Sequence, residues 1–147
     1  MLYSRRIFMS GLIEELKHEH SKIAVLLKEV LQLGINSNEG RKRLFDARGY
    51  LLAHLRKEDT RLYPVLREAS LENTELSQLL DNCIDEMDEI SKAALSFFDQ
   101  YAQGGDEQSF VSDFKQLYRV LNERILREET ELYDIYDDFQ RQCGGGE

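Results

Sequence analysis

The chain has 147 residues, of which 41% are hydrophobic and 32% charged, a balance typical of one soluble globular domain rather than a disordered chain. Its net charge of -9 and its pI near 4.9 argue against nucleic acid and anionic membrane surfaces as partners, because both require an excess of Lys and Arg. No apolar run approaches the length of a membrane span.

The cysteines and the N-terminus both bear on the cellular compartment. Two cysteines do not make a disulfide framework, and we expect Cys83 to be a buried packing residue and Cys143 an exposed thiol in the Gly-rich tail. The segment Ser4-Arg5-Arg6-Ile7-Phe8-Met9 matches a twin-arginine export signal, but charged residues follow it where an apolar stretch is required. We therefore predict a cytoplasmic protein.

The first predicted helix begins after residues 1–10, which we expect to form a flexible N-terminal arm with Ser10 as a candidate helix cap. Residues at alternating spacings of three and four then form a seam typical of a helical bundle. This seam comprises Ile13, Leu16, His20, Ile23, Leu27 and Val30. The turn-rich segment 34–40 (GINSNEG) ends the helix.

The second predicted helix covers about residues 41–69 and carries two residues that are unusual for a core. Its seam comprises Leu44, Ala47, Leu51, His54, Glu58, Leu62 and Val65. His54 and Glu58 are four residues apart, so on a helix they point the same way into an apolar seam. Burying both is costly unless something binds them. Pro64 is expected to kink this helix or to remove one hydrogen bond near its end.

Two further helices complete the pattern. Asn73 or Thr74 is predicted to cap the third, and the segment 103–106 (QGGD) to end it. Helical seams run through Leu76, Leu80, Cys83, Met87, Ile90, Ala94 and Phe97, and through Phe110, Phe114, Leu117, Leu121, Arg124, Glu128, Leu132 and Ile135. We predict an all-α, antiparallel up-down-up-down four-helix bundle over residues 11–140, followed by a disordered tail at 141–147.

The two halves of the chain resemble each other. Residues 19–23 (EHSKI) align with 86–90 (EMDEI), and residues 54–63 (HLRKEDTRLY) align with 124–133 (RILREETELY). An approximate two-fold axis between two helical hairpins would bring six seam positions to one level of the bundle. These positions are His20, His54, Glu58, Met87, Arg124 and Glu128.

The motifs EHSKI, HLRKEDTRLYP and REETELY resemble the hemerythrin-like, HHE cation-binding domain family over roughly residues 12–136. The resemblance implies a hemerythrin-like four-helix bundle with a non-haem di-iron centre for oxygen binding, for sensing oxygen or nitric oxide, or for iron handling. It implies metal ligation by His20, His54, Glu58 and Glu128. Met87 and Arg124 occupy the positions at which the third and fourth helices would supply histidines.

The chemistry of Met87 and Arg124 does not favour a full di-iron centre. A thioether is a poor ligand for iron, and a guanidinium has no lone pair to give and stays protonated. Arg124 is instead expected to pair with Glu58, Glu128 or both, so that these substitutions occlude the second half of the site. Three states remain open: a metal-free site closed by Arg124, a single iron or zinc ion, and, least favoured, a full di-iron centre. We expect Tyr63, Tyr133 and Tyr136 to be packing or interface rings.

The expected function is that of a hemerythrin-like cation-binding domain with a degenerate di-iron site. It would bind at most one metal ion, iron or zinc, and act in sensing or regulation rather than as an enzyme, with a small diatomic molecule as a further candidate ligand. The alternative is a metal-free bundle that serves as a protein-interaction or regulatory module.

Overall fold

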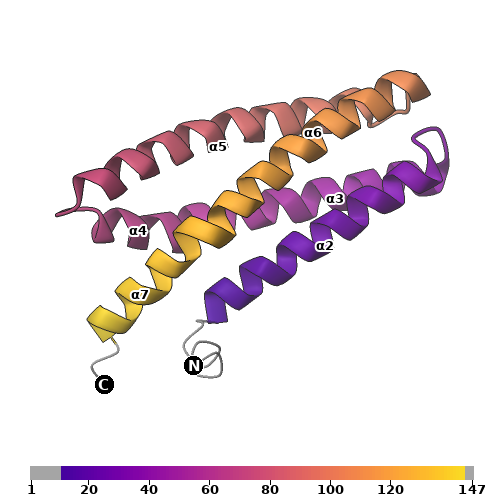
Figure 1. Cartoon of the computed structure of the whole chain (residues 1–147). Coiled ribbons are helices and arrows are strands. Elements are labelled where there is room, and N and C mark those ends of the chain that lie inside the picture. Colours follow the sequence, from indigo (N-terminus) through magenta and orange to yellow (C-terminus); the bar gives the residue numbers. More distant parts are fainter. Residues whose placement is uncertain (1–10, 145–147) are drawn as a thin grey trace.

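The computed structural model describes residues 11–144 and confirms an all-α four-helix bundle (Figure 1). Residues 11–144 contain no strand. The predicted arm at 1–10, including Ser10, lies outside the described residues, as do residues 145–147. The elements in chain order are α2 (Gly11–Leu33), α3 (Asn38–Lys57), the π-helical turn η1 (Glu58–Leu62), α4 (Tyr63–Ala69), α5 (Thr74–Tyr101), α6 (Glu107–Arg127), the π-helical turn η2 (Glu128–Leu132) and α7 (Tyr133–Gly144).

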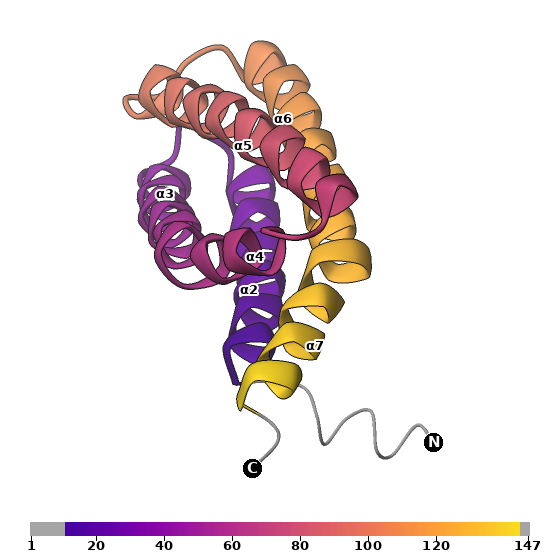
Figure 2. The same ribbon diagram turned by 90° about the vertical axis from the view of Figure 1, so that its left-hand side faces the viewer.

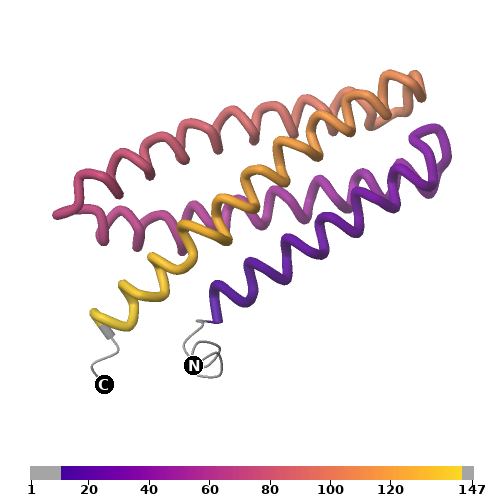
Figure 3. Tube along the Cα trace, in the orientation of Figure 1, coloured from indigo at the N-terminus to yellow at the C-terminus, as the bar shows by residue number. Residues whose placement is uncertain are grey.

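These elements form four antiparallel arms: α2, then α3 with η1 and α4, then α5, then α6 with η2 and α7. Seen after a quarter turn, the arms surround a common interior, with α2 between the α3–α4 arm and the α6–α7 arm (Figure 2). The Cα trace shows the loops after α2 and α5 at one end of the bundle and the turn before α5 at the other (Figure 3). Residues from distant parts of the sequence therefore meet at one depth of the bundle.

Side-chain caps define where three of the helices begin. Ser37, Asn73 and Asp106 each have extended backbone, and each side-chain oxygen accepts a hydrogen bond from the backbone N–H three residues later. Of the two predicted caps for the third helix, Asn73 is the one used. Gly34 ends α2 with a φ of 82°, in the left-handed region that glycine adopts without strain. At the other end of the chain, α7 continues to Gly144 rather than ending near Gln140.

The apolar core is divided into two clusters along the bundle. One cluster includes Ile23, Leu51 and Phe114 near the α2–α3 loop, and the other includes Leu16, Leu66 and Leu132 near the α4–α5 turn. Buried polar residues from α2, α3, α6 and the two π-turns lie between them, and these are His20, His54, Glu58, Arg124 and Glu128. A polar layer inside an apolar core is costly unless its members satisfy one another or bind a ligand.

The two π-turns occupy equivalent places in the two halves. Each begins at a buried glutamate, Glu58 or Glu128, and ends where a tyrosine N–H donates to the carbonyl of that glutamate five residues earlier. In each turn a threonine hydroxyl also donates to the carbonyl four residues before it. Pro64, which we expected to distort this helix, lies beyond η1 in the first turn of α4. Proline is not the shared cause, because η2 forms without one.

None of the helices within residues 11–144 combines the length and the apolar character that crossing a bilayer would need.

Candidate metal centre

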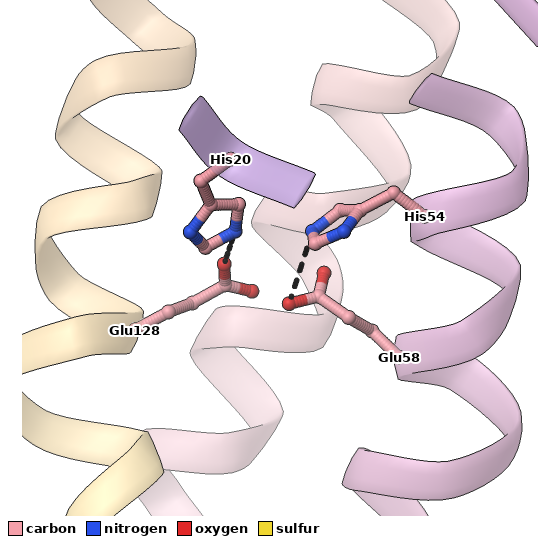
Figure 4. Close-up of side chains that lie close together, drawn as sticks. All are labelled: His20, His54, Glu58 and Glu128. Atoms are coloured by element: carbon pink, nitrogen blue, oxygen red, sulfur yellow. Dashed lines mark ion pairs between the residues drawn. The ribbon is translucent and has the colours of Figure 1, made fainter. Parts of the chain in front are cut away.

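The four predicted ligands come together in the polar layer. His20 and His54 are 5% and 3% exposed, and Glu58 and Glu128 are each 1% exposed. Each residue offers one potential ligand atom, and these four atoms all lie within 4.8 Å of one another. Nε2 of His20 is 3.4 Å from Oε1 of Glu128, and Nε2 of His54 is 3.5 Å from Oε2 of Glu58 (Figure 4). The geometry is that of a ligand cluster, while metal ligation itself remains a prediction.

Each histidine is oriented by a second carboxylate on its outer side. Nδ1 of His54 is 2.8 Å from Oε1 of Glu19, and Nδ1 of His20 is 2.8 Å from Oε2 of Glu129. A proton on Nδ1 then donates to the carboxylate and leaves the Nε2 lone pair directed at the centre, the arrangement common among metal-binding histidines. Both carboxylates immediately neighbour a predicted ligand in sequence, but the helical spacing alone does not indicate that they contact the histidines.

The charges around His54 favour its protonated form in the metal-free protein. Burial alone would lower the pKa of His54, but hydrogen bonding and attraction from Glu58, followed by Glu19, raise it to about 9. Burial of Glu19 acts to raise its pKa, but its bonds to Lys57 and His54 bring the pKa below its usual value. Burial and repulsion from Glu128 raise the pKa of Glu58 to about 7. The two buried carboxylates, Glu58 and Glu128, therefore repel each other, and a cation between them would relieve that repulsion.

Tyr63 and Tyr133 are part of the site, which corrects their prediction as packing or interface rings. Tyr63 Oη donates to Oε2 of Glu128 at 3.2 Å, and Tyr133 Oη lies 3.1 Å from Oε2 of Glu58 and 3.2 Å from Nε2 of His20. Burial, together with the nearby carboxylates, raises the pKa of both phenols. A regular α-helix stacks residues three or four apart, so a residue five positions after each glutamate was not assigned to the same face. The π-turns bring it there.

Arg124 fills the second half of the site. Only 7% exposed, it donates from Nη1 to the carbonyl of Cys83 at 2.9 Å and from Nη2 to the hydroxyl of Tyr63. Its Nε lies 3.4 Å from Oε2 of Glu128. This nitrogen makes no hydrogen bond to any of residues 11–144. The prediction that Arg124 pairs with a buried carboxylate is confirmed for Glu128.

The two halves of the site keep the same outer charges around different inner residues. In the first half, Glu19 contacts both His54 and Lys57. In the second half, Glu86 lies 3.9 Å from Nη1 of Arg124 and 2.6 Å from Nη1 of Arg127, in matching sequence positions. The guanidinium of Arg124 therefore occupies the position that is equivalent to the imidazole of His54.

Met87, the other predicted substitution, is 5% exposed and belongs to the apolar cluster near the α4–α5 turn. It matches His20 in the repeat and offers only a soft thioether there.

The donor set of the described cluster fits a bound metal ion. Two imidazoles and two carboxylates suit Fe(II) or Zn(II), and each histidine already has the outer hydrogen bond that such ligands use. The second half offers a guanidinium, which repels a cation, and a thioether.

The fold and this cluster define a four-helix bundle with a buried group of histidines and carboxylates that could hold a cation. The sequence comparison agrees, because the family of the hemerythrin HHE cation binding domain matches residues 10–136. The chain belongs to this family. No curated protein and no solved structure matches the chain significantly.

Proposed function

We propose that this protein binds a single metal ion, iron or zinc, and acts in sensing or regulation rather than in catalysis. His20, His54, Glu58 and Glu128 would hold the ion. The observation that carries the proposal is the asymmetry of the polar layer. Four buried donors, three from the first half of the chain and Glu128 from the second, converge at one point, and the Arg124 guanidinium occupies the position of a further imidazole.

Residues around the donors have separate tasks in this proposal. Glu19 and Glu129 hold the two imidazoles with Nε2 inward. Arg124 neutralises Glu128 from the side away from His20, so one carboxylate oxygen stays directed at the cluster. The apolar clusters on both sides of the layer exclude water and strengthen these electrostatic contacts. When bound, iron would supply a position for a small diatomic molecule such as oxygen or nitric oxide, whereas zinc would supply a redox-inert ion.

A metal-free interaction or regulatory module is the second candidate function. One observation favours it: the buried charges can pair without a metal, because His54 lies between Glu58 and Glu19 and Arg124 lies beside Glu128. A protein partner would then meet a strongly acidic surface, given the net charge of -9.

Metal analysis of protein purified without oxygen separates the two functions. We expect about one equivalent of iron or zinc per chain in the wild type, and loss of that metal in His54→Ala. His18→Ala is the matched control, because His18 lies on α2 but outside the buried cluster, and it should retain the metal. No bound metal in the wild type would leave the interaction module, and two irons with an oxo-bridged absorption band would contradict the single-ion proposal.

We also propose a cytoplasmic location. Both cysteines are free, with Cys83 buried and Cys143 exposed as expected from the sequence, which is the usual state of thiols in a reducing compartment. Fractionation of the native host should place the protein with the cytoplasmic contents.

A further inference from the structure

The hydroxyl of Tyr133 lies between two of the predicted metal ligands. Its Oη is 3.1 Å from Oε2 of Glu58 and 3.2 Å from Nε2 of His20, and the ring is 1% exposed. The imidazole of His20 stacks on the same ring, with centroids 5.9 Å apart. The oxygen is therefore held on two sides inside the donor cluster.

The hydrogen bonds around Tyr133 leave two lone pairs facing each other without a proton between them. Tyr133 has one hydroxyl proton and two acceptors within reach. When that proton points to Glu58, the remaining lone pairs of Oη face Nε2 of His20. With the Nδ1 proton of His20 directed at Glu129, Nε2 also presents a lone pair. Two lone pairs 3.2 Å apart repel each other, and a positive ion between them satisfies both.

We propose that Tyr133 Oη is a fifth ligand of the metal ion. Neighbouring ligands of one ion bound at about 2.0–2.1 Å lie roughly 2.9–3.4 Å apart. Tyr133 Oη has such spacings, at 3.1 Å from Glu58 and 3.2 Å from His20. The predicted ligands have similar spacings, at 3.4 Å between Glu128 and His20 and 3.5 Å between Glu58 and His54. The four ligand atoms already lie within 4.8 Å of one another, and Tyr133 Oη adds a fifth oxygen at ligand spacing from two of them.

Tyr63, the counterpart of Tyr133 in the other half, cannot take the same role. Its hydroxyl accepts a hydrogen bond from Nη2 of Arg124 and donates to Oε2 of Glu128. The guanidinium also places a positive charge beside that oxygen. Tyr63 therefore contacts Glu128 as Tyr133 contacts Glu58. The hydroxyl oxygen of Tyr63, however, already accepts a hydrogen bond from Arg124. This difference makes Tyr63 the matched control for Tyr133.

Binding would change the role of Tyr133 from donor to ligand. The Oη–H bond breaks, the proton passes to water, and a bond forms between the phenolate oxygen and the metal ion. The alternative is that Tyr133 only orients Glu58 by a hydrogen bond. Affinity does not separate the two roles, because removing the hydrogen-bond partner of a ligand also weakens metal binding about 10–100-fold. The visible spectrum does, since a phenolate-to-iron(III) charge-transfer band requires the phenolate oxygen of Tyr133 to be bound to the iron, whereas a hydrogen-bonding role gives no such band.

The test uses the full chain, loaded with Fe(II) without oxygen and then oxidised with ferricyanide. We expect a visible phenolate-to-iron(III) band, with phenolate ring modes in the resonance Raman spectrum, in the wild type and in Tyr63→Phe. Tyr133→Phe should bind iron without either signal. Circular dichroism checks that both variants remain helical.

The inference rests on the proposed single-ion site, and the outcomes separate the two. Iron bound by the wild type without the band, or a band that survives in Tyr133→Phe, would overturn tyrosine ligation and leave the single-ion site standing. A wild type that takes up no iron, measured by metal analysis of the same sample, would overturn both.

Discussion

Replacing Arg124 by alanine removes the guanidinium that lies against the buried carboxylate of Glu128. The guanidinium is 7% exposed, the carboxylate is 1% exposed, and Nε is 3.4 Å from Oε2. Removing one partner of a buried ion pair costs about 3–5 kcal/mol, because the other charge stays buried without compensation. We expect the loss of unfolding free energy to lie near the lower end of this range, since Glu128 retains contacts with Tyr63 and His20.

Urea unfolding of metal-free protein in a chelating buffer measures this loss directly. The matched control is Arg67→Ala, because Arg67 pairs with Asp81 at 2.9 Å but is 40% exposed, and exposed pairs contribute about 0–1 kcal/mol. We predict that Arg124→Ala lowers the free energy of unfolding by about 3 kcal/mol, with an unchanged urea dependence. Equal, small losses in the two variants would show that Arg124 does not neutralise a buried charge, and the reasoning would be wrong.

Three further predictions follow from the site and the fold. Arg124→His should raise the amount of iron bound per chain, because it restores an imidazole to the second half; unchanged metal content would count against the occlusion. Glu19→Gln and Glu129→Gln should each weaken zinc binding about 10–100-fold in a competition titration, since each removes the charge that orients a histidine; equal affinities would mean that the outer carboxylates are dispensable. Gly40→Ala should destabilise the protein by more than about 1 kcal/mol, because its Cβ would lie 1.7 Å from a backbone oxygen, whereas Gly49→Ala meets nothing within 4 Å and should stabilise α3 by about 0.5–1 kcal/mol in the same urea assay.

The seam residues were predictable because they follow the ordinary helical repeat. Spacings of three and four placed His20, His54 and Glu58 on inward faces, and the similarity between the two halves brought Arg124 and Glu128 to the same level. All five are buried in one layer, as the repeat required. Position on a seam depends only on local periodicity, which a single sequence displays.

The tyrosines were not predictable from that periodicity. Tyr63 and Tyr133 follow the buried glutamates by five residues, a spacing that a regular α-helix turns away from the seam. The only sequence signal is that E-x-T-x-L-Y occurs in both halves, with a threonine that bonds back to the carbonyl four residues earlier. Pro64 predicts a kink in one half only, so it does not indicate the π-turn that both halves share.

The outer carboxylates were missed for a different reason. Glu19 lies beside His20 in sequence but orients His54 on another helix, and Glu129 lies beside Glu128 but orients His20. Both cross from one helix to its neighbour, so their pairing depends on the rotation of whole helices rather than on a motif. Such contacts require coordinates.

The central claim is that one metal ion lies among the four buried donors and that Arg124 occupies the position of a further imidazole. Anomalous X-ray scattering from crystals grown with zinc tests it most directly. We predict one anomalous peak among His20, His54, Glu58 and Glu128, with the Arg124 guanidinium beside Glu128. Two peaks within the bundle, or no peak in this layer, would contradict the claim.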